Sequence, residues 1–344
     1  MLNNWFFRSA FSALPIIMAL TVTTILLAVM GVSPAEAYRN IFLGAFERPE
    51  KLAEVLFALV PLVLCSAGLL LTFSAGLWNI GIEGQIVFGA ISTTFAVRTF
   101  DLPLPILLPL LILAGAVGGG FWGWVVGVLK TSGRVNEIFA GLGLNFIALS
   151  FANYLILGPW QRAGIASTSG TELFRPVVWL PTFSDFAFGP VELFLAVFAS
   201  AGVYFFLRQT RVGLELKAVG QSLKASFLLG IPVDSRLLLA LIICGMLAGL
   251  SGAVQVLGLY HRLTPSISSG YGYLAILVVM LSGMRVSGII PIAFFFAAVN
   301  KGSLQLPLQL QIDSSLGGFL QSVLVLFVLL IKGLEERFAF WERR

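Results

Sequence analysis

Charged residues are scarce in this chain of 344 residues. They make up 11% of it, against about 25% in an ordinary soluble domain, while 58% of the residues are hydrophobic. The mean hydropathy is +0.98. This composition excludes an ordinary soluble domain and predicts an all-α polytopic bundle of membrane helices. The net charge of +5 does not indicate a nucleic-acid partner, because the basic residues are spread over short loops rather than gathered in one patch.

Cysteine and histidine are too few to build a metal site or a disulfide framework. Cys65 and Cys244 both fall in apolar stretches, where small buried side chains are expected, and His261 lies in a short loop. The chain has no GxxxxGK[ST] loop, no HExxH and no GxSxG, and its aspartates lie in or near loops. We therefore expect no catalytic residue, no metal site and no enzyme activity.

Long apolar stretches are frequent, and about ten membrane spans can be drawn. The first stretch, about 22 residues long, favours a membrane span over a cleaved signal peptide, although Ala35-Glu36-Ala37 resembles a cleavage site. The eighth and ninth stretches are short, which is typical of broken or re-entrant helices that line a cavity. The expected spans are 10–31, 53–74, 82–98, 104–129, 136–157, 191–207, 237–259, 271–284, 288–304 and 316–331.

The distribution of Lys and Arg indicates an orientation. If the spans alternate sides, most of the 21 basic residues fall on the side of the N-terminus, chiefly in segment 208–236 and in the C-terminal tail. We therefore expect both termini in the cytoplasm. Segments 32–52 and 158–190 then lie outside, the second as an ordered or interfacial loop. No soluble domain of ordinary size fits, so residues 1–344 are expected to form a single transmembrane domain.

Glycines recur at a strict four-residue interval in one of these spans. Gly115, Gly119, Gly123 and Gly127 share one helix face. Such a stripe lets a second helix approach closely, and packing is its expected role.

Glu83 is the single charged residue between Glu54 and Arg98. A carboxylate at membrane depth is costly unless it faces a bundle interior or a water-filled cavity. It lies in segment 79–85, Asn-Ile-Gly-Ile-Glu-Gly-Gln. Two interpretations stay open, a structural role bonded to backbone amides freed at Gly81 and Gly84, or a place in a solute pathway.

Amide side chains form the other polar positions inside the spans. Such amides offer both donors and acceptors, which suits uncharged polar solutes such as sugars or nucleosides, but they also commonly join helices to one another. The candidate pathway residues are Asn79, Glu83, Gln85, Asn145 and Gln255.

Segment 208–236 carries short amphipathic turns punctuated by glycine. A short exposed helix between two spans needs a partner for its apolar side. A membrane-surface helix is one interpretation, and a docking surface for a cytoplasmic protein, which explains the glycines better, is the other.

These segments together carry a family resemblance. Segment 79–85 followed by Gly89-Ala90 resembles the signature of inner-membrane permeases of ATP-binding-cassette importers, in the branch for nucleosides and simple sugars that is related to ribose and branched-chain amino-acid permeases. Residues 136–148, 213–233 and 270–275 are similar to further blocks of that family. The resemblance implies that 213–233 docks an ATPase, through Gly213, Glu215, Lys217, Ala218, Gly220, Ala225 and Gly230.

The resemblance also implies partners. It predicts two cytoplasmic ATPase subunits that hydrolyse ATP, a second permease subunit (identical or homologous), and an external or periplasmic receptor protein or lipoprotein, all at the bacterial cytoplasmic membrane among its lipids. A nucleoside is the expected solute, with a sugar as the alternative. A secondary transporter that uses Glu83 as an ion site and a non-transporting scaffold are the competing hypotheses.

Overall fold

The computed structural model describes residues 17–162, 169–183, 186, 188–310, 315–323, 326, 327 and 330. Over these residues the chain is helical and contains no strand, which confirms the all-α class. The chain divides into two compact units, one of Met1–Val55 with Phe294–Arg344 and one of Leu56–Ala293. We call them unit 1 and unit 2. That residues 1–344 act as one permease domain stays a prediction.

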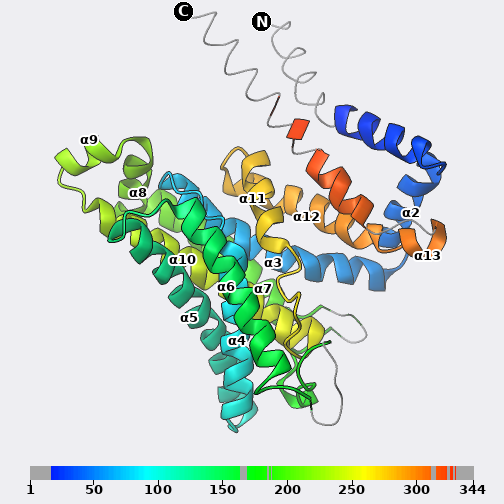
Figure 1. Ribbon diagram of the computed structural model, residues 1–344, viewed down its shortest axis with the longest axis horizontal. Helices are drawn as coiled ribbons and strands as arrows, with labels where there is room; N and C mark the ends of the chain where they lie inside the picture. The colour runs from blue at the N-terminus through cyan, green and yellow to red at the C-terminus, as the bar shows by residue number, and fades with distance from the viewer. Residues whose placement is uncertain are drawn as a thin grey trace, which may run out of the picture. The chain divides into compact units, whose positions relative to one another are not determined.

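The helices follow the expected apolar stretches (Figure 1). Six described helices are long and apolar enough to cross a membrane, or seven if the bent pair Ile17–Val29 and Pro34–Phe46 is one span. The elements are α2 (Pro34–Phe46), α3 (Pro49–Ser74), α4 (Ile82–Thr99), α5 (Leu104–Thr131), α6 (Glu137–Leu157), η1 (Pro176–Val178), α7 (Pro190–Gln209), α8 (Arg211–Gln221), α9 (Leu223–Leu228), α10 (Val233–Val254), η2 (Gln255–Tyr260), α11 (Tyr271–Leu281), α12 (Val286–Ser303) and α13 (Leu306–Leu310).

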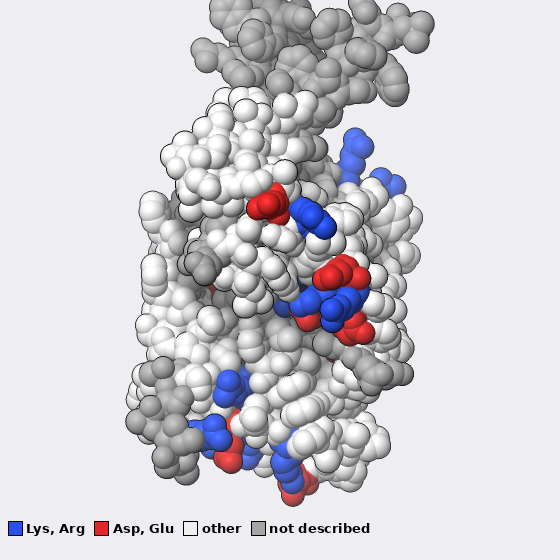
Figure 2. All heavy atoms as spheres, turned by 90° about the vertical axis from the view of Figure 1, so that its right-hand side faces the viewer, with Lys and Arg blue, Asp and Glu red and all other residues white. Residues whose placement is uncertain are grey.

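The expected number of spans is somewhat too high. Helix α11 has 11 residues and so extends about 16 Å, roughly half the hydrocarbon thickness. Helix α4 has 18 residues but carries buried Glu83, Thr93 and Thr94, which lower its hydropathy. Part of the expected span 316–331 lies outside the described residues. Figure 2 shows one face of the molecule, where charged side chains form a few small groups on a largely uncharged surface.

Unit 1 is organised around a sharp bend. The helix Ile17–Val29 meets α2 at 115°. Ser33 caps α2, since its hydroxyl accepts a hydrogen bond from the Glu36 amide. Segment 32–52, expected as a connection between spans, is therefore largely helical. The core of the unit is a small apolar cluster that comprises Leu27, Ala37, Ile41, Leu306 and Leu316.

In unit 2, glycines join α5 to α10. A Cβ atom on Gly119 would meet the carbonyl of Gly245 and the backbone of Gly249, and one on Gly123 would meet the Leu241 carbonyl. Only glycine permits two helix backbones to approach this closely. The packing role predicted for the glycine stripe is confirmed.

Different segments of the chain form the two ends of unit 2. Helices α8 and α9 lie at one end, and the described part of the 158–190 segment lies at the other (Figure 1). That part is ordered by backbone hydrogen bonds to the chain after α10: the Thr171 amide donates to the Leu263 carbonyl at 2.9 Å, and the Phe174 amide to the His261 carbonyl at 2.8 Å. Trp179 stacks on His261 with 3.9 Å between ring centroids. Burial lowers the pKa of His261 below its ordinary value.

Candidate functional site

The start of α4 gathers three of the buried polar side chains of unit 2, Asn79, Glu83 and Gln85. The chain leaves α3 at Ser74 and begins α4 at Ile82. Asn79 and Gln85 bracket this break. The Asn79 Nδ2 atom donates to Gln85 Oε1 at 3.0 Å, and Gln85 Nε2 donates back to Asn79 Oδ1 at 3.3 Å. Both side chains are fully buried, so their amides satisfy each other across the break.

Asn145 of α6 binds the first turn of α4. Its Oδ1 atom accepts from the Gly84 amide at 2.8 Å, and its Nδ2 atom donates to the Ile80 carbonyl at 2.9 Å. The N-cap residue of α4, Gly81, makes no side-chain cap hydrogen bond. Helix starts leave backbone N–H groups without partners, so Asn145 acts as a cap supplied by another helix.

The glycines beside Glu83 allow this contact. A Cβ atom on Gly81 would lie 2.9 Å from the Cα atom of Gly141 in α6. One on Gly84 would lie 2.9 Å from Asn145 Oδ1. Any larger residue at either position would push α4 away from α6. The glycines in segment 79–85 are therefore required by close helix packing.

Glu83 binds the start of α11. Its Oε1 atom accepts from the Tyr273 amide at 3.1 Å, and the Ser268 hydroxyl and Gly272 amide are further hydrogen-bonding neighbours. The N-cap residue of α11, Gly270, has a φ of 73° and makes no side-chain cap hydrogen bond. A carboxylate at a helix N-terminus satisfies free amides and interacts favourably with the helix dipole.

Glu83 thus has a structural role, as one of the two interpretations held, but its hydrogen-bond partners are not the amides freed at Gly81 and Gly84 that were expected. The carboxylate binds the amides of α11, whereas the amide freed at Gly84 goes to Asn145. The side chain is 3% exposed. Together the two contacts connect α6 to α4 and α4 to α11.

Gln255 stands apart from this network. It is fully buried at the start of the π-helix η2, and neither its Oε1 nor its Nε2 atom finds a hydrogen-bond partner among the described residues. Short π-helical segments frequently occur at functional sites. An amide buried without partners costs free energy, so Gln255 is the least satisfied of the five predicted pathway residues.

Glu192 shares these properties and was missed by the sequence reasoning. It lies in the first turn of α7 and is fully buried. Its carboxylate makes no well-formed hydrogen bond among the described residues, although the backbone amides of Gly189 and Glu192 are hydrogen-bonding neighbours. A Cβ atom on Gly258 of η2 would lie 3.2 Å from its Oε1 atom, so Glu192 faces the π-helix. A lone carboxylate just inside the expected span 191–207 was the available signal.

The candidate docking segment folds into α8 and α9. Glu215 accepts from Arg211 Nε at 2.9 Å and from Arg236 Nε at 2.6 Å. The hydrogen bond from Arg236 is the largest influence that lowers the pKa of Glu215 below its usual range. A Cβ atom on Gly213 would meet the Phe206 carbonyl, and one on Gly220 the Ser74 carbonyl. These three positions pack α8 against its neighbours within unit 2.

The other expected docking residues lie in different surroundings. Lys217 and Ala218 are half-buried on α8. The Ala225 amide donates to the Ser222 hydroxyl that caps α9. Gly230 has a φ of 78°, a conformation that glycine adopts readily, and open space around it.

The most exposed part of this segment is apolar. Helix α9 and the residue after it carry four large apolar side chains with exposed fractions from 53% to 78%. The sequence reasoning, which relied on the family pattern, did not single them out. They are Leu223, Phe227, Leu228 and Leu229.

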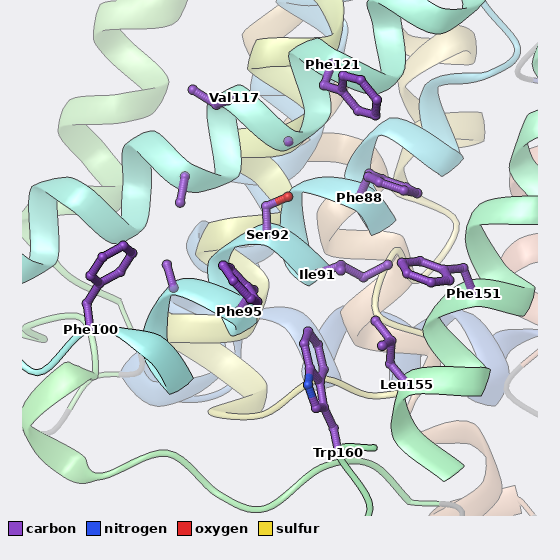
Figure 3. A pocket seen from close by; sticks show the side chains of 13 residues that line it. Phe88, Ile91, Ser92, Phe95, Phe100, Val117, Phe121, Phe151, Leu155 and Trp160 are labelled. Atoms are coloured by element: carbon purple, nitrogen blue, oxygen red, sulfur yellow. The ribbon is translucent and has the colours of Figure 1, made fainter. Parts of the chain in front are cut away.

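A large hollow between α4, α5 and α6 is almost wholly apolar. It has a volume of about 670 Å³, and the rings of Phe88, Phe95, Phe121 and Phe151 surround it (Figure 3). Ser92 and Trp160 contribute the polar side-chain atoms of its lining. Hydroxyl groups of a polar solute would stay largely unpaired there, so this hollow does not suit a solute pathway.

Fold and site together define a multi-pass membrane protein with broken, remotely capped helices. The family model for the permease component of the branched-chain amino acid transport system matches residues 51–329, and the chain belongs to this family. The resemblance inferred from segment 79–85 is thereby confirmed. The match covers both the capped helix starts and segment 208–236.

Curated relatives refine the branch. The glucose ABC transporter permease protein of Haloferax volcanii is 30% identical, over 92% of this chain and 86% of that protein. The guanosine ABC transporter permease protein of Bacillus subtilis is 28% identical, over 91% and 90%. The nucleoside ABC transporter permease protein of Lactococcus lactis is 27% identical, over 88% and 85%.

Proposed function

We propose that this chain is the membrane-spanning subunit of an ATP-driven importer and that its solute is a nucleoside. The observation that carries the transport role is the α8–α9 pair, which is packed into unit 2 at Gly213 and Gly220 and exposes the apolar side chains of α9. Such a surface suits a docked protein, and the close packing of α8 at Gly213 and Gly220 would transmit a movement of the docked protein to the helix bundle. The guanosine and nucleoside permeases among the relatives support the solute.

The same arrangement defines the proposed partners and orientation. ATPase subunits cover α9 on the cytoplasmic side of a bacterial cytoplasmic membrane, with both chain termini on that side. ATP is hydrolysed in those subunits, and the permease needs no cofactor of its own. A second permease subunit and an external receptor complete the importer. Nucleotide-driven closure of the ATPases moves α8 and α9, and so biases a two-state change in the bundle.

Within the bundle, Gln255 is the strongest candidate for solute contact. The amide groups of Asn79, Gln85 and Asn145 bond to one another, to backbone, and to the side chains of Cys244 and Tyr273, so these three residues hold helix starts in place. Both hydrogen-bonding atoms of Gln255 remain available to a solute that reaches η2. Glu83 is bonded to α11, which speaks against its use as the ion site of a secondary transporter.

The decisive experiment measures ATP hydrolysis by the assembled complex with its receptor. We expect stimulation by guanosine or another nucleoside and none by glucose. A sugar is the second candidate, favoured by the glucose permease at 30% identity, and stimulation by glucose alone would replace the nucleoside assignment. Ion-driven uptake by the purified chain without ATPase subunits would overturn the importer role itself.

Two variant pairs locate the proposed sites. The double variant Phe227→Ser, Leu228→Ser on α9 should abolish co-purification of the ATPase and leave the thermal stability of the permease nearly unchanged, because both side chains are exposed.

Gln255→Leu should reduce the stimulation of ATP hydrolysis by the solute, while the stability of the permease stays unchanged or rises. Its matched control, Gln85→Leu, should lower stability by about 1–3 kcal/mol, because it removes the donor to Asn79 Oδ1 and leaves Asn79 Nδ2 with the Cys244 sulfur as its remaining partner. Full solute stimulation in Gln255→Leu would contradict the contact.

A further inference from the structure

A second cavity lies at the α8 end of unit 2. It has a volume of about 400 Å³, and segments distant in sequence form it: the end of α3, the end of α7, helix α8 and the turn that leads into α12. Its polar and charged lining residues are Ser74, Tyr204, Arg208, Lys217, Arg285 and Ser287.

The charge of this cavity has one sign. Arg208, Lys217 and Arg285 line it, and no carboxylate does. None of the three forms an ion pair with any residue that the structure describes. Clefts lined by one sign of charge concentrate counter-ions.

The neighbouring cations behave differently, which makes the arrangement informative. Arg211 and Arg236 both bind Glu215, and Lys130 binds Glu137 at 2.6 Å. Arg211, Arg236 and Lys130 thus have carboxylate partners, whereas the three cations of the cavity, like the exposed Lys224 and Arg134, have none among the described residues. Repulsion among the three cations that line one cavity is reduced when an anion binds there.

The remaining polar groups are also suited to an anion. Helix α12 begins at Val286, and Val286 and Ser287 of its first turn line the cavity, where helix N-terminal amides favour an anion. The hydroxyls of Ser74 and Ser287 are further donors. The Arg208 guanidinium is held in place, since its Nη1 atom donates to the Tyr204 hydroxyl at 3.2 Å. A phosphate group has acceptor oxygens on every side and matches such a set of donors.

We propose that this cavity binds a phosphate group, carried by a phospholipid headgroup or by a small soluble phosphate compound. The bound anion would connect α8 of the proposed docking segment to the turn between α11 and α12. Since Glu83 caps the other end of α11, occupancy would stiffen the link between the docking segment and the network at α4. The binding itself does not depend on which solute is transported.

The test uses the full-length chain in nanodiscs of phosphatidylcholine, with and without phosphatidylglycerol. Native mass spectrometry measures retained phosphatidylglycerol, and equilibrium dialysis measures binding of inorganic pyrophosphate. Retention of the lipid alone identifies a headgroup site, and pyrophosphate binding identifies a site open to soluble phosphates. Either result supports the proposal, and binding of neither probe by the wild type overturns it.

Matched variants assign the binding to the cavity. Lys217→Gln and Arg285→Gln should each weaken binding about fivefold. Lys224→Gln on α9 and Arg134→Gln between α5 and α6, exposed cations outside the cavity, should leave it unchanged. Equal affinity in all four variants would overturn the assignment. So would cross-linking of Lys217 to an ATPase carboxylate that pyrophosphate does not compete with, because the cavity would then be a protein-docking surface.

Discussion

Two groups of helices in unit 2 are capped in different ways. Helices α6, α8 and α9 are capped by their own N-cap side chains, Asn136, Thr210 and Ser222. Helices α4 and α11 have glycine at the N-cap, and their first-turn amides are satisfied by Asn145 and Glu83 of other helices. The first group begins near the surface, and the second begins in the interior.

The difference shows how polar groups at membrane depth join helices. A local cap stabilises the one helix that carries it. A remote cap stabilises the start of one helix only while a second helix stays in place, so it couples their positions. The sequence of contacts α6 to α4 to α11 therefore forms a continuous polar link through unit 2.

Removal of a remote cap should have the largest effect. Asn145→Leu leaves the Gly84 amide and the Ile80 carbonyl without this partner, and we expect a loss of about 2–4 kcal/mol in the free energy of unfolding. Thermal unfolding in detergent measures it. Asn153→Leu is the matched control on the same helix, since Asn153 is exposed and should change stability by less than about 0.5 kcal/mol. Equal shifts in both variants would refute the remote cap.

Substitutions of Glu83 sharpen the comparison. Glu83→Leu removes the acceptor of the Tyr273 amide, and we expect a loss of about 2 kcal/mol. Glu83→Gln keeps an acceptor oxygen and loses the charge, so about 1 kcal/mol or less is expected. Amide hydrogen exchange at Tyr273 should rise strongly in the first variant and slightly in the second.

Transport separates the two remaining explanations of Glu83. If the carboxylate acts as a cap, Glu83→Gln should keep most of the solute-stimulated ATP hydrolysis. Complete loss of stimulation in a Glu83→Gln protein of near wild-type stability would show that the charge itself is required.

Much of this could be predicted from the sequence, and the limit has a physical reason. The four-residue interval of Gly115 to Gly127 reveals a packing face, because helix periodicity is local. Glu83 and Asn145 stand out as polar positions in apolar spans, yet their partners lie 190 and 61 residues away. Helix propensity and capping rules describe neighbours in sequence, so neither remote cap could be assigned.

The same limit explains the errors elsewhere. Segment 32–52 was expected only as a long segment outside the membrane, and the helix that begins after its Ser33 cap was not predicted. Residues of α9 were overlooked because an apolar residue in a short segment gives no sign of its exposure. Gln255 was noted as polar, but only the folded chain reveals that it lacks a partner among the described residues.

Removal of a local cap should have a smaller, confined effect. Ser222→Ala removes the acceptor of the Ala225 amide, and we expect about 1 kcal/mol. Hydrogen exchange should rise in α9, while exchange in α4 and α11 should stay unchanged. A fall in global stability as large as that of Asn145→Leu would remove the distinction between local and remote caps.

Glu215 offers the smallest test, since it has one local and one remote partner. Arg211 is its i,i−4 neighbour with a side chain 92% exposed, whereas Arg236 comes from α10 and is 21% exposed. Exposed pairs contribute little, so Arg236→Gln should raise the pKa of Glu215 toward its ordinary value more than Arg211→Gln does.

The lowered pKa of Glu215 has a consequence for the pH dependence of stability. A carboxyl whose pKa is lowered in the folded chain stabilises the fold at pH values above its unfolded pKa of about 4.3, and this stabilisation is lost as the pH falls through the folded pKa. Hydrogen exchange in α8, corrected for intrinsic rates, should therefore rise in acid for the wild type, whereas in Arg236→Gln it should already be higher than wild type at neutral pH and change less as the pH falls. Equal changes of hydrogen exchange in Arg236→Gln and Arg211→Gln would mean that a partner from another helix stabilises α8 no more than a partner from α8 itself.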